Sequence, residues 1–171
     1  MRTEYLLDKE MERILGLLMP QNRLVMRTIL HTGLRVSDVL TLKPEQLQPH
    51  IWITEQKTGK RRQVGFPAPL LDDLRRNAGE KWVFESRTDP DKHRTRQTVW
   101  ADVKRAAKAY RLPQNIGTHS ARKCYAVELL HKYGDIEKVR RALQHSSVEV
   151  TTLYAMADVA LNVKYHLTKR G

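Results

Sequence analysis

Along most of this chain the apolar residues recur at helical spacing, but one short stretch follows the spacing of β-strands. Ile51 and Ile53 alternate with polar neighbours, as do Val64 and Phe66, and a Thr-Gly pair between the two runs supplies a turn. Alternation with a period of two on both sides of such a turn predicts a β-hairpin. The apolar stripes elsewhere predict helices that each bury one face. The sequence therefore predicts a mainly α-helical fold with a small antiparallel β-sheet, of the α+β class.

Capping and breaking residues set the expected bounds of the helices. Asp8 is expected to cap the first helix, Pro20 to end it, and Gly33 to end the second, with a short third helix running up to Pro44. The elements expected after this point are a helix through Leu70, Leu71 and Leu74, a polar exposed loop from Ser86 to Arg96, a helix through Val99, Val103 and Ala106, and three final helices that run from His119 to about His131, from the Asp135 cap, and from the Ser146 cap with Glu149 in its capping box.

The balance of charges indicates a polyanionic partner. The chain carries 31 Lys and Arg against 19 Asp and Glu, a formal charge of +12. A basic excess of this size favours nucleic acid, and we expect double-stranded DNA. No apolar run approaches the roughly 20 residues of a membrane-spanning helix, and no signal-peptide pattern opens the chain. We therefore expect no membrane association and a soluble, intracellular protein.

Length and cysteine usage limit the architecture further. The chain has 171 residues and one cysteine, Cys124. This length suits one domain, so we expect residues 1–171 to form a single domain. A lone cysteine excludes an internal disulfide and a cysteine-rich zinc site, and the histidines show no spacing typical of metal ligands. Cys124 is expected to fill the core, and so are Trp52 and Trp100.

Two arginines and a histidine are candidates for binding one phosphate group. His119 and Arg122 are three residues apart at the start of a predicted helix, so both side chains point the same way. A guanidinium can donate two parallel hydrogen bonds to non-bridging phosphate oxygens, which suits a transition state with charge spread over those oxygens. Arg35, at the corner before the third helix, is the expected second clamp, and Asp38 is expected to orient it through an ion pair.

The remaining chemistry requires a nucleophile and an acid. A phosphodiester can be opened without metal if a nucleophile attacks phosphorus in line while an acid protonates the departing 5′ oxygen. Tyr154 is the expected nucleophile, and because a phenol titrates near about pH 10, nearby cations must stabilise its phenolate. His145, with the two arginines, could supply that positive field. Lys57, at the bend of the hairpin, is the expected general acid.

The motifs that carry these residues resemble those of tyrosine recombinases of the lambda-integrase type. HTGLRVSDVLTL (31–42) is similar to the family's first arginine box, and THSARKCYAVELL (118–130) to its histidine-x-x-arginine box. LQHSSVEVTTLYAMAD (143–158) is similar to the closing histidine and nucleophile segment, and EQKTGKRRQVGFP (55–67) carries the hairpin lysine. All six positions occur in the family's order, so the resemblance spans almost the whole chain.

This resemblance implies a recombinase catalytic domain that forms a 3′-phosphotyrosyl bond and leaves a free 5′ hydroxyl. It implies strand exchange in a homotetramer on paired DNA sites, with neither a metal nor a nucleotide cofactor, while a monomer is expected without DNA. By the same resemblance, residues 1–171 are expected to form the catalytic domain without the family's N-terminal DNA-binding domain, and the protein is expected to be bacterial or phage-encoded, cytoplasmic and nucleoid-associated. By the resemblance, Arg35 and Arg122 hold the scissile phosphate, Lys57 is the acid, and His119 and His145 bind the phosphate or assist proton transfer. Tyr154 forms the covalent bond.

Two further functions remain open at this stage. A type IB topoisomerase uses a similar pocket and tyrosine, but it relaxes supercoils without pairing two sites. A catalytically inactive DNA-binding remnant is the other alternative, although such a remnant would be expected to have lost some of the six residues. In each case basic side chains outside the site are expected to contact DNA phosphates. The candidates for these contacts are Lys60, Arg61, Arg62, Lys92, Arg94 and Arg96.

Overall fold

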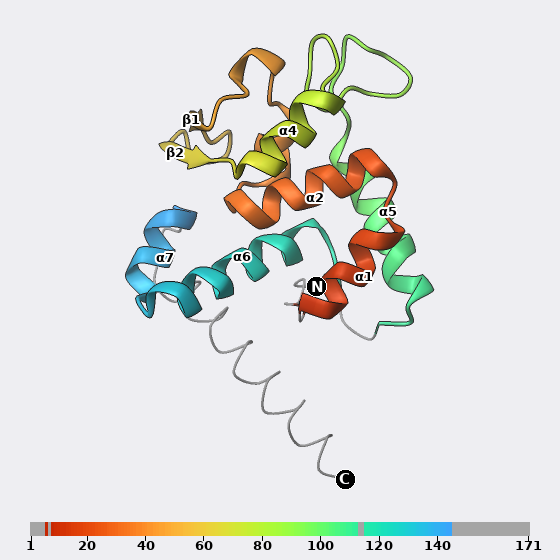
Figure 1. Ribbon diagram of the computed structural model, residues 1–171. Coiled ribbons are helices and arrows are strands. Elements are labelled where there is room, and N and C mark those ends of the chain that lie inside the picture. The colour runs from red at the N-terminus through yellow and green to blue at the C-terminus, as the bar shows by residue number, and fades with distance from the viewer. Residues whose placement is uncertain (1–5, 7, 113–114, 145–171) are drawn as a thin grey trace.

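The computed structural model describes residues 6, 8–112 and 115–144, which form a helical body with a hairpin at one edge (Figure 1). The helix expected from Ser146 lies outside the described residues. The elements in chain order are α1 (Asp8–Leu17), α2 (Pro20–Thr32), α3 (Val36–Leu40), the 3-10 helix η1 (Pro44–Gln46), β1 (His50–Thr54), β2 (Arg61–Gly65), α4 (Ala68–Asn77), α5 (Arg96–Ala109), α6 (Thr118–Tyr133) and α7 (Ile136–Leu143). The predicted class, mainly α with a small antiparallel sheet, is confirmed.

Helix α2 lies at the centre of the body. It packs beside α6 on one side and beneath α4 on the other, while α1 and α5 close the end away from the hairpin (Figure 1). Val25, Met26 and Ile29 on α2 are almost completely buried. Cys124 of α6 is buried in the same core, as expected. An apolar face on α2 thus joins the segments on either side of the hairpin into one core.

The hairpin follows the predicted alternation, with one correction. Ile51 pairs with Val64 and Ile53 with Arg62, and the two isoleucines and the valine are buried. Trp52 points to the opposite face and is 55% exposed, because successive side chains of a strand alternate between faces. The expectation of a buried Trp52 was therefore wrong. Trp100 was also misplaced and is 52% exposed, because Val99 and Val103 take the buried face of α5.

The helix boundaries follow the expected chemistry, with two differences. Gly33 ends α2 in the left-handed conformation at φ 63°, as predicted. Pro20, however, is the first residue of α2, and α1 has already ended at Leu17. Proline suits a first helical position because the amide hydrogen that it lacks would have no partner there. The short helix η1 was not predicted.

No helix in residues 6–144, as far as they are described, is long and apolar enough to cross a membrane.

Candidate active site

The corner between α2 and α3 is built around Gly33. Its positive φ turns the chain at the end of α2, and a Cβ at this position would overlap the ring of Tyr125 on α6. Leu34 is completely buried and anchors the corner to the core. Arg35 follows in extended conformation just before α3, so its side chain leaves the corner while its backbone stays fixed. The sequence HTGLR thus presents one arginine from a rigid turn.

Glu55, at the end of β1, holds the Arg35 side chain in place. Its carboxylate is completely buried, and its Oε2 atom pairs with Nη1 of Arg35. The hydroxyl of Thr58 donates to the same Oε2 atom at 3.1 Å. A buried carboxylate that accepts from a guanidinium and a hydroxyl fixes the guanidinium strongly. Sequence reasoning missed Glu55, although it continues the inward phase of Ile51 and Ile53, and an acid on an inward face requires a cation.

Asp38 has a different role from the one expected. It was expected to orient Arg35 through an ion pair, but the described ion pair of Arg35 is with Glu55. Oδ1 of Asp38 instead accepts the backbone N–H of Gln56 at 3.0 Å, which ties the start of the hairpin bend to α3. Burial raises the pKa of Asp38, and the nearby Glu55 adds to this, while Arg35 and Arg122 oppose it. Asp38 therefore positions the bend that carries Lys57.

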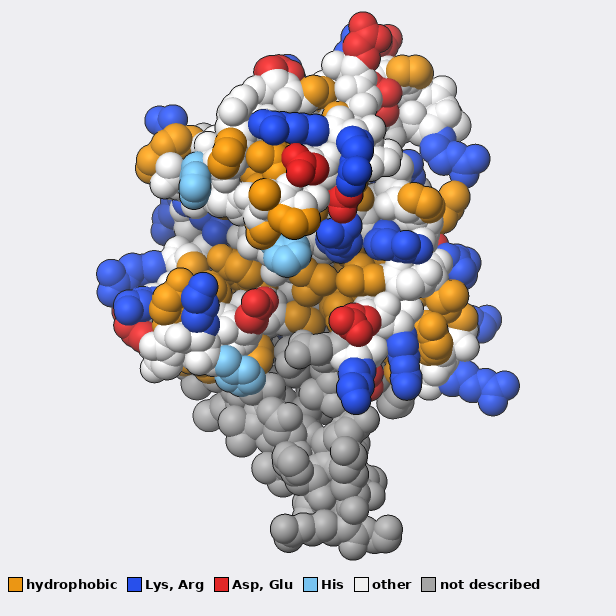
Figure 2. Space-filling view, in the orientation of Figure 1, with side chains coloured by type: hydrophobic (Ala, Val, Ile, Leu, Met, Phe, Trp, Pro, Cys, Tyr) orange, Lys and Arg blue, Asp and Glu red, His pale blue; other side chains and the backbone are white. Residues whose placement is uncertain are grey.

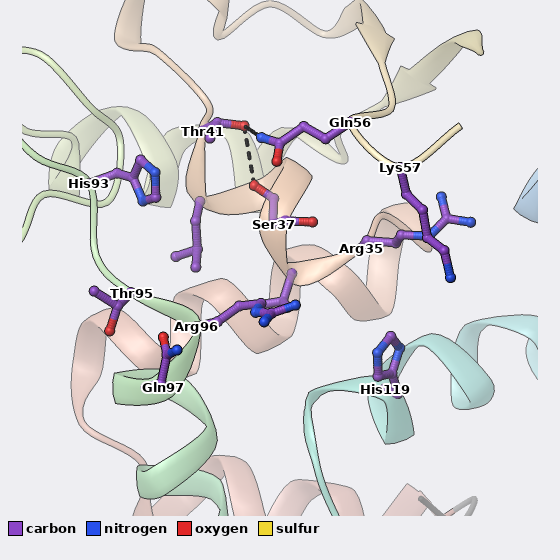
Figure 3. A pocket seen from close by; sticks show the side chains of 12 residues that line it. Arg35, Ser37, Thr41, Gln56, Lys57, His93, Thr95, Arg96, Gln97 and His119 are labelled. Carbon is purple, nitrogen blue, oxygen red and sulfur yellow. Dashed lines mark hydrogen bonds between the residues drawn. The ribbon is translucent and has the colours of Figure 1, made fainter. Parts of the chain in front are cut away.

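A pocket of about 680 Å³ opens between this corner, the hairpin bend and the starts of α5 and α6. Arg35, Lys57 and His119 come from three separate segments and all line it. In Figure 3 the side chains of Arg35 and Lys57 lie together on one side, with the His119 ring below them and Arg96 across the opening. The other polar side chains of the lining are those of Ser37, Thr41, Gln56, His93, Thr95 and Gln97.

The electrostatics of the pocket act on His119. Loss of hydration lowers the pKa of its ring, and the positive charges of Arg122, Arg35, Lys123 and Lys57 lower it further. The imidazole is consequently neutral at pH 7, with one nitrogen able to donate a hydrogen bond and the other able to accept one. Cations gathered around a neutral imidazole form a site that favours an anion with several oxygens.

Arg122 lies beside this pocket and is only 4% exposed. Its Nη1 atom donates to the carbonyl of Gly33 at 2.5 Å, and its Nη2 atom donates to the carbonyl of Leu143 at 2.6 Å. Arg122 therefore connects the corner that carries Arg35 with the end of α7. Both arginines expected to hold the phosphate lie at the same corner.

The basic residues that were expected to contact DNA divide into exposed and internal side chains. The exposed ones are Lys60, Arg61, Lys92 and Arg96, of which Arg96 also lines the pocket. On the face shown in Figure 2, Lys and Arg side chains spread over the upper part and both flanks with acidic side chains between them. On this face the positive charge is thus spread over the surface and not gathered in one patch (Figure 2).

Arg62 and Arg94 differ from the expectation of exposed DNA contacts. The side chain of Arg62 is 10% exposed; it donates to the carbonyls of Thr32 and Ala142, and its Nε lies 3.5 Å from Oε1 of Glu55. Because Arg62 shares the inward face of β2 with Val64, it is a structural link, and its assignment to a DNA surface was wrong. Arg94 is 6% exposed and lines a separate cavity, so it does not belong to an exposed basic run.

The last two predicted residues, His145 and Tyr154, lie outside the described residues. The described part of α7 ends at Leu143, whose carbonyl accepts a hydrogen bond from Arg122. Within the described residues no group of three or more His, Cys, Asp or Glu side chains is arranged to hold a metal ion.

Comparison with known proteins identifies the family. Residues 4–160 match the profile of the phage integrase family. The chain belongs to this family. The probable integrase/recombinase YoeC of Bacillus subtilis strain 168 is 31% identical over 135 residues, which cover 75% of this phage integrase-family chain and 74% of YoeC. The tyrosine recombinase XerA of Pyrococcus furiosus is 28% identical over 143 residues, and the match covers 78% of this chain and 49% of XerA. The chain thus spans about half the length of XerA.

Solved structures share the integrase fold. The catalytic domain of bacteriophage HP1 integrase has a TM-score of 0.69 at 24% identity, with 91% of this chain and 89% of that domain covered. A lambda integrase dimer bound to a core site has a TM-score of 0.75 at 21% identity, covering 90% of this chain and 59% of that protein. These likenesses establish that the described elements form the catalytic fold of the phage integrase family.

Proposed function

We propose that this chain is the catalytic domain of a tyrosine-type site-specific recombinase, which cleaves and rejoins double-stranded DNA through a 3′-phosphotyrosyl bond at Tyr154. The observation that carries the proposal is the convergence of Arg35, Lys57 and His119 from three segments on one pocket, with Arg122 buried beside it. A binding remnant would not need a lysine, a neutral imidazole and two fixed arginines at one place. The relatives named as integrases and tyrosine recombinases support the same reading.

Cleavage exchanges one phosphoester for another. The phenolate oxygen of Tyr154 attacks phosphorus, the bond from phosphorus to the 5′ oxygen breaks, and Lys57 gives a proton to that oxygen. Arg35 and Arg122 stabilise the charge on the non-bridging oxygens, and because Glu55 already holds Arg35, this costs little reorganisation. His119 and His145 bind the phosphate or assist proton transfer. Attack by a 5′ hydroxyl on the phosphotyrosyl bond reverses the step and reseals a strand, without metal or nucleotide cofactor.

The assembly follows from this chemistry. Exchange between two duplexes requires four cleavages, so we propose a homotetramer on paired DNA sites and a monomer without DNA. The exposed cations Lys60, Arg61, Lys92 and Arg96 would contact phosphates around the scissile one. A protein that acts on chromosomal or phage DNA would work at the nucleoid.

A nicked suicide substrate, from which the cleaved end diffuses away, tests the proposal. Wild type is expected to accumulate a covalent protein–DNA adduct, and Tyr154→Phe to form none while still binding the duplex. Absence of an adduct with wild type would favour the binding remnant. Relaxation of a supercoiled plasmid that lacks any recombination site would favour a type IB topoisomerase. Recombination between two cognate sites, without relaxation of that plasmid, is the expected outcome.

A further inference from the structure

A second cavity, of about 310 Å³, lies at the start of α5. It adjoins the candidate active site, because Thr95 lines both. The side chains around it are two arginines and four hydroxyl residues: Ser86, Arg87, Thr88, Arg94, Thr95 and Thr98. Among the described residues, no acidic side chain lines this cavity. The composition is therefore that of a site for an oxyanion.

Arg94 is the residue that requires a ligand. It is 6% exposed, and its Nε atom has no hydrogen-bond partner within the part of the chain that the structure describes. Burial lowers the pKa of its guanidinium, and the positive charge of Arg87 lowers it further. A buried cation beside a second cation costs stability unless an anion pairs with it. The arrangement is expected where the missing partner comes from a ligand.

Asp102, the one acid among the described residues that acts on Arg94, is committed to other groups. Asp102 raises the pKa of Arg94 weakly, as the last of its influences. Its Oδ2 atom accepts the backbone N–H of Met19 and the Asn22 side chain, each at 2.8 Å, and its Oδ1 atom accepts Arg105 at 3.0 Å and 2.6 Å. Asp102 therefore holds α5 against the start of α2 and does not neutralise Arg94.

The backbone adds to the attraction for an anion. The cavity lies at the N-terminus of α5, a helix of 14 residues whose first amides carry partial positive charge. Thr95 caps the helix by accepting the Thr98 N–H at 3.2 Å, and the two threonine hydroxyls lie 2.8 Å apart. Two guanidinium groups, two threonine hydroxyls and a helix terminus match the several acceptor oxygens of one phosphate.

We propose that this cavity binds a phosphate group, and that on DNA the group is a backbone phosphate next to the scissile one. The second part rests on the proposed recombinase function, and the first does not. A DNA strand would then be bound at two neighbouring phosphates, the scissile one in the candidate active site and the next one in this cavity, with Thr95 between the two sites. The site then fixes the register of the cleaved strand without reading its sequence.

The test compares wild type with Arg94→Met, which keeps an unbranched side-chain stem and removes the charged guanidinium. Lys108→Met is the matched control, since Lys108 is exposed at the other end of α5. Inorganic phosphate, at ionic strength matched with sodium chloride, is expected to raise the melting temperature of wild type and Lys108→Met but not of Arg94→Met. On a duplex, the slope of log K against log salt is expected to fall by about one for Arg94→Met alone.

The two measurements distinguish a phosphate of the DNA backbone from free inorganic phosphate as the ligand. A changed salt slope without a response to free phosphate assigns the site to the DNA backbone. A phosphate response with an unchanged slope assigns it to free phosphate and overturns the DNA part. If Arg94→Met equals wild type in both measurements, the site does not exist. Arg87→Met removes an exposed cation from the same cavity and provides the second variant should Arg94→Met fail to fold. Wild type that responds to phosphate but forms no suicide-substrate adduct would contradict the recombinase alone.

Discussion

Two short basic segments look alike in the sequence, the hairpin run at 60–62 and the run at 92–96 before α5, yet their internal arginines differ. In the hairpin, Arg62 turns inward and meets the buried carboxylate of Glu55 and the carbonyls of Thr32 and Ala142. In the second segment, Arg94 also turns inward, but among the described residues its guanidinium has neither a hydrogen bond to a carbonyl nor an ion pair with a carboxylate. A buried arginine whose guanidinium binds carbonyls and faces a carboxylate is part of the structure, whereas one that meets neither indicates a place for a ligand.

The comparison predicts its largest effect for Arg62→Met. Removing this guanidinium leaves the Glu55 charge partly unpaired and two carbonyls without their donor, so the free energy of unfolding should fall by about 3–5 kcal/mol. Arg61→Met, one residue away and exposed, should change it by less than about 0.5 kcal/mol. Chemical denaturation measures both. Equal stability of the two variants would show that Arg62 is no more structural than its neighbour, and would remove the contrast with Arg94.

A smaller effect is expected when Glu55 is changed to glutamine. The variant keeps the shape but loses the charge that holds Arg35, so the single-turnover rate of adduct formation should fall about tenfold, which corresponds to about 1.4 kcal/mol of transition-state stabilisation. DNA affinity should change little, because Arg35 itself remains. Glu45→Gln, at an exposed acid of η1, is the control. If the Glu55→Gln variant cleaved at the wild-type rate, the charge of Glu55 would not be what positions Arg35.

The smallest expected effect is a change in the pKa of His119, which should respond to a charge in the hairpin but not to one in the segment at 92–96. His119 should titrate below its ordinary pKa of 6.5, so it is neutral at pH 7 and gains its proton only as the pH falls through that lowered value. Lys57→Met removes one of the cations that lower this pKa and should raise it, whereas Lys92→Met, in the other segment, should not move it. Imidazole NMR signals followed from pH 5 to 8 give the titration. If the pKa of His119 moved by the same amount in both variants, Lys57 would act on His119 no more strongly than Lys92 does.

Sequence reasoning predicted the fold class, the Gly33 corner and the segments that carry Arg35, Lys57 and His119, because each depends on local spacing or a local turn. It failed where the environment of a side chain depends on distant partners. Arg62 was misassigned because a run of basic residues was given more weight than strand alternation, and Trp52 because strand alternation was not applied to it. Arg94 could not have been placed, because its loop has no period from which burial can be inferred.

The central claim is that the phosphate pocket serves a nucleophile at position 154. The most direct measurement is mass spectrometry of the tryptic peptides from the adduct trapped with a suicide substrate by wild type and by Arg35→Ala. The account predicts a nucleotide joined through its 3′ phosphate to the peptide that contains Tyr154, and a strong loss of that adduct in Arg35→Ala. Attachment to any other residue, or an undiminished adduct without Arg35, would contradict it.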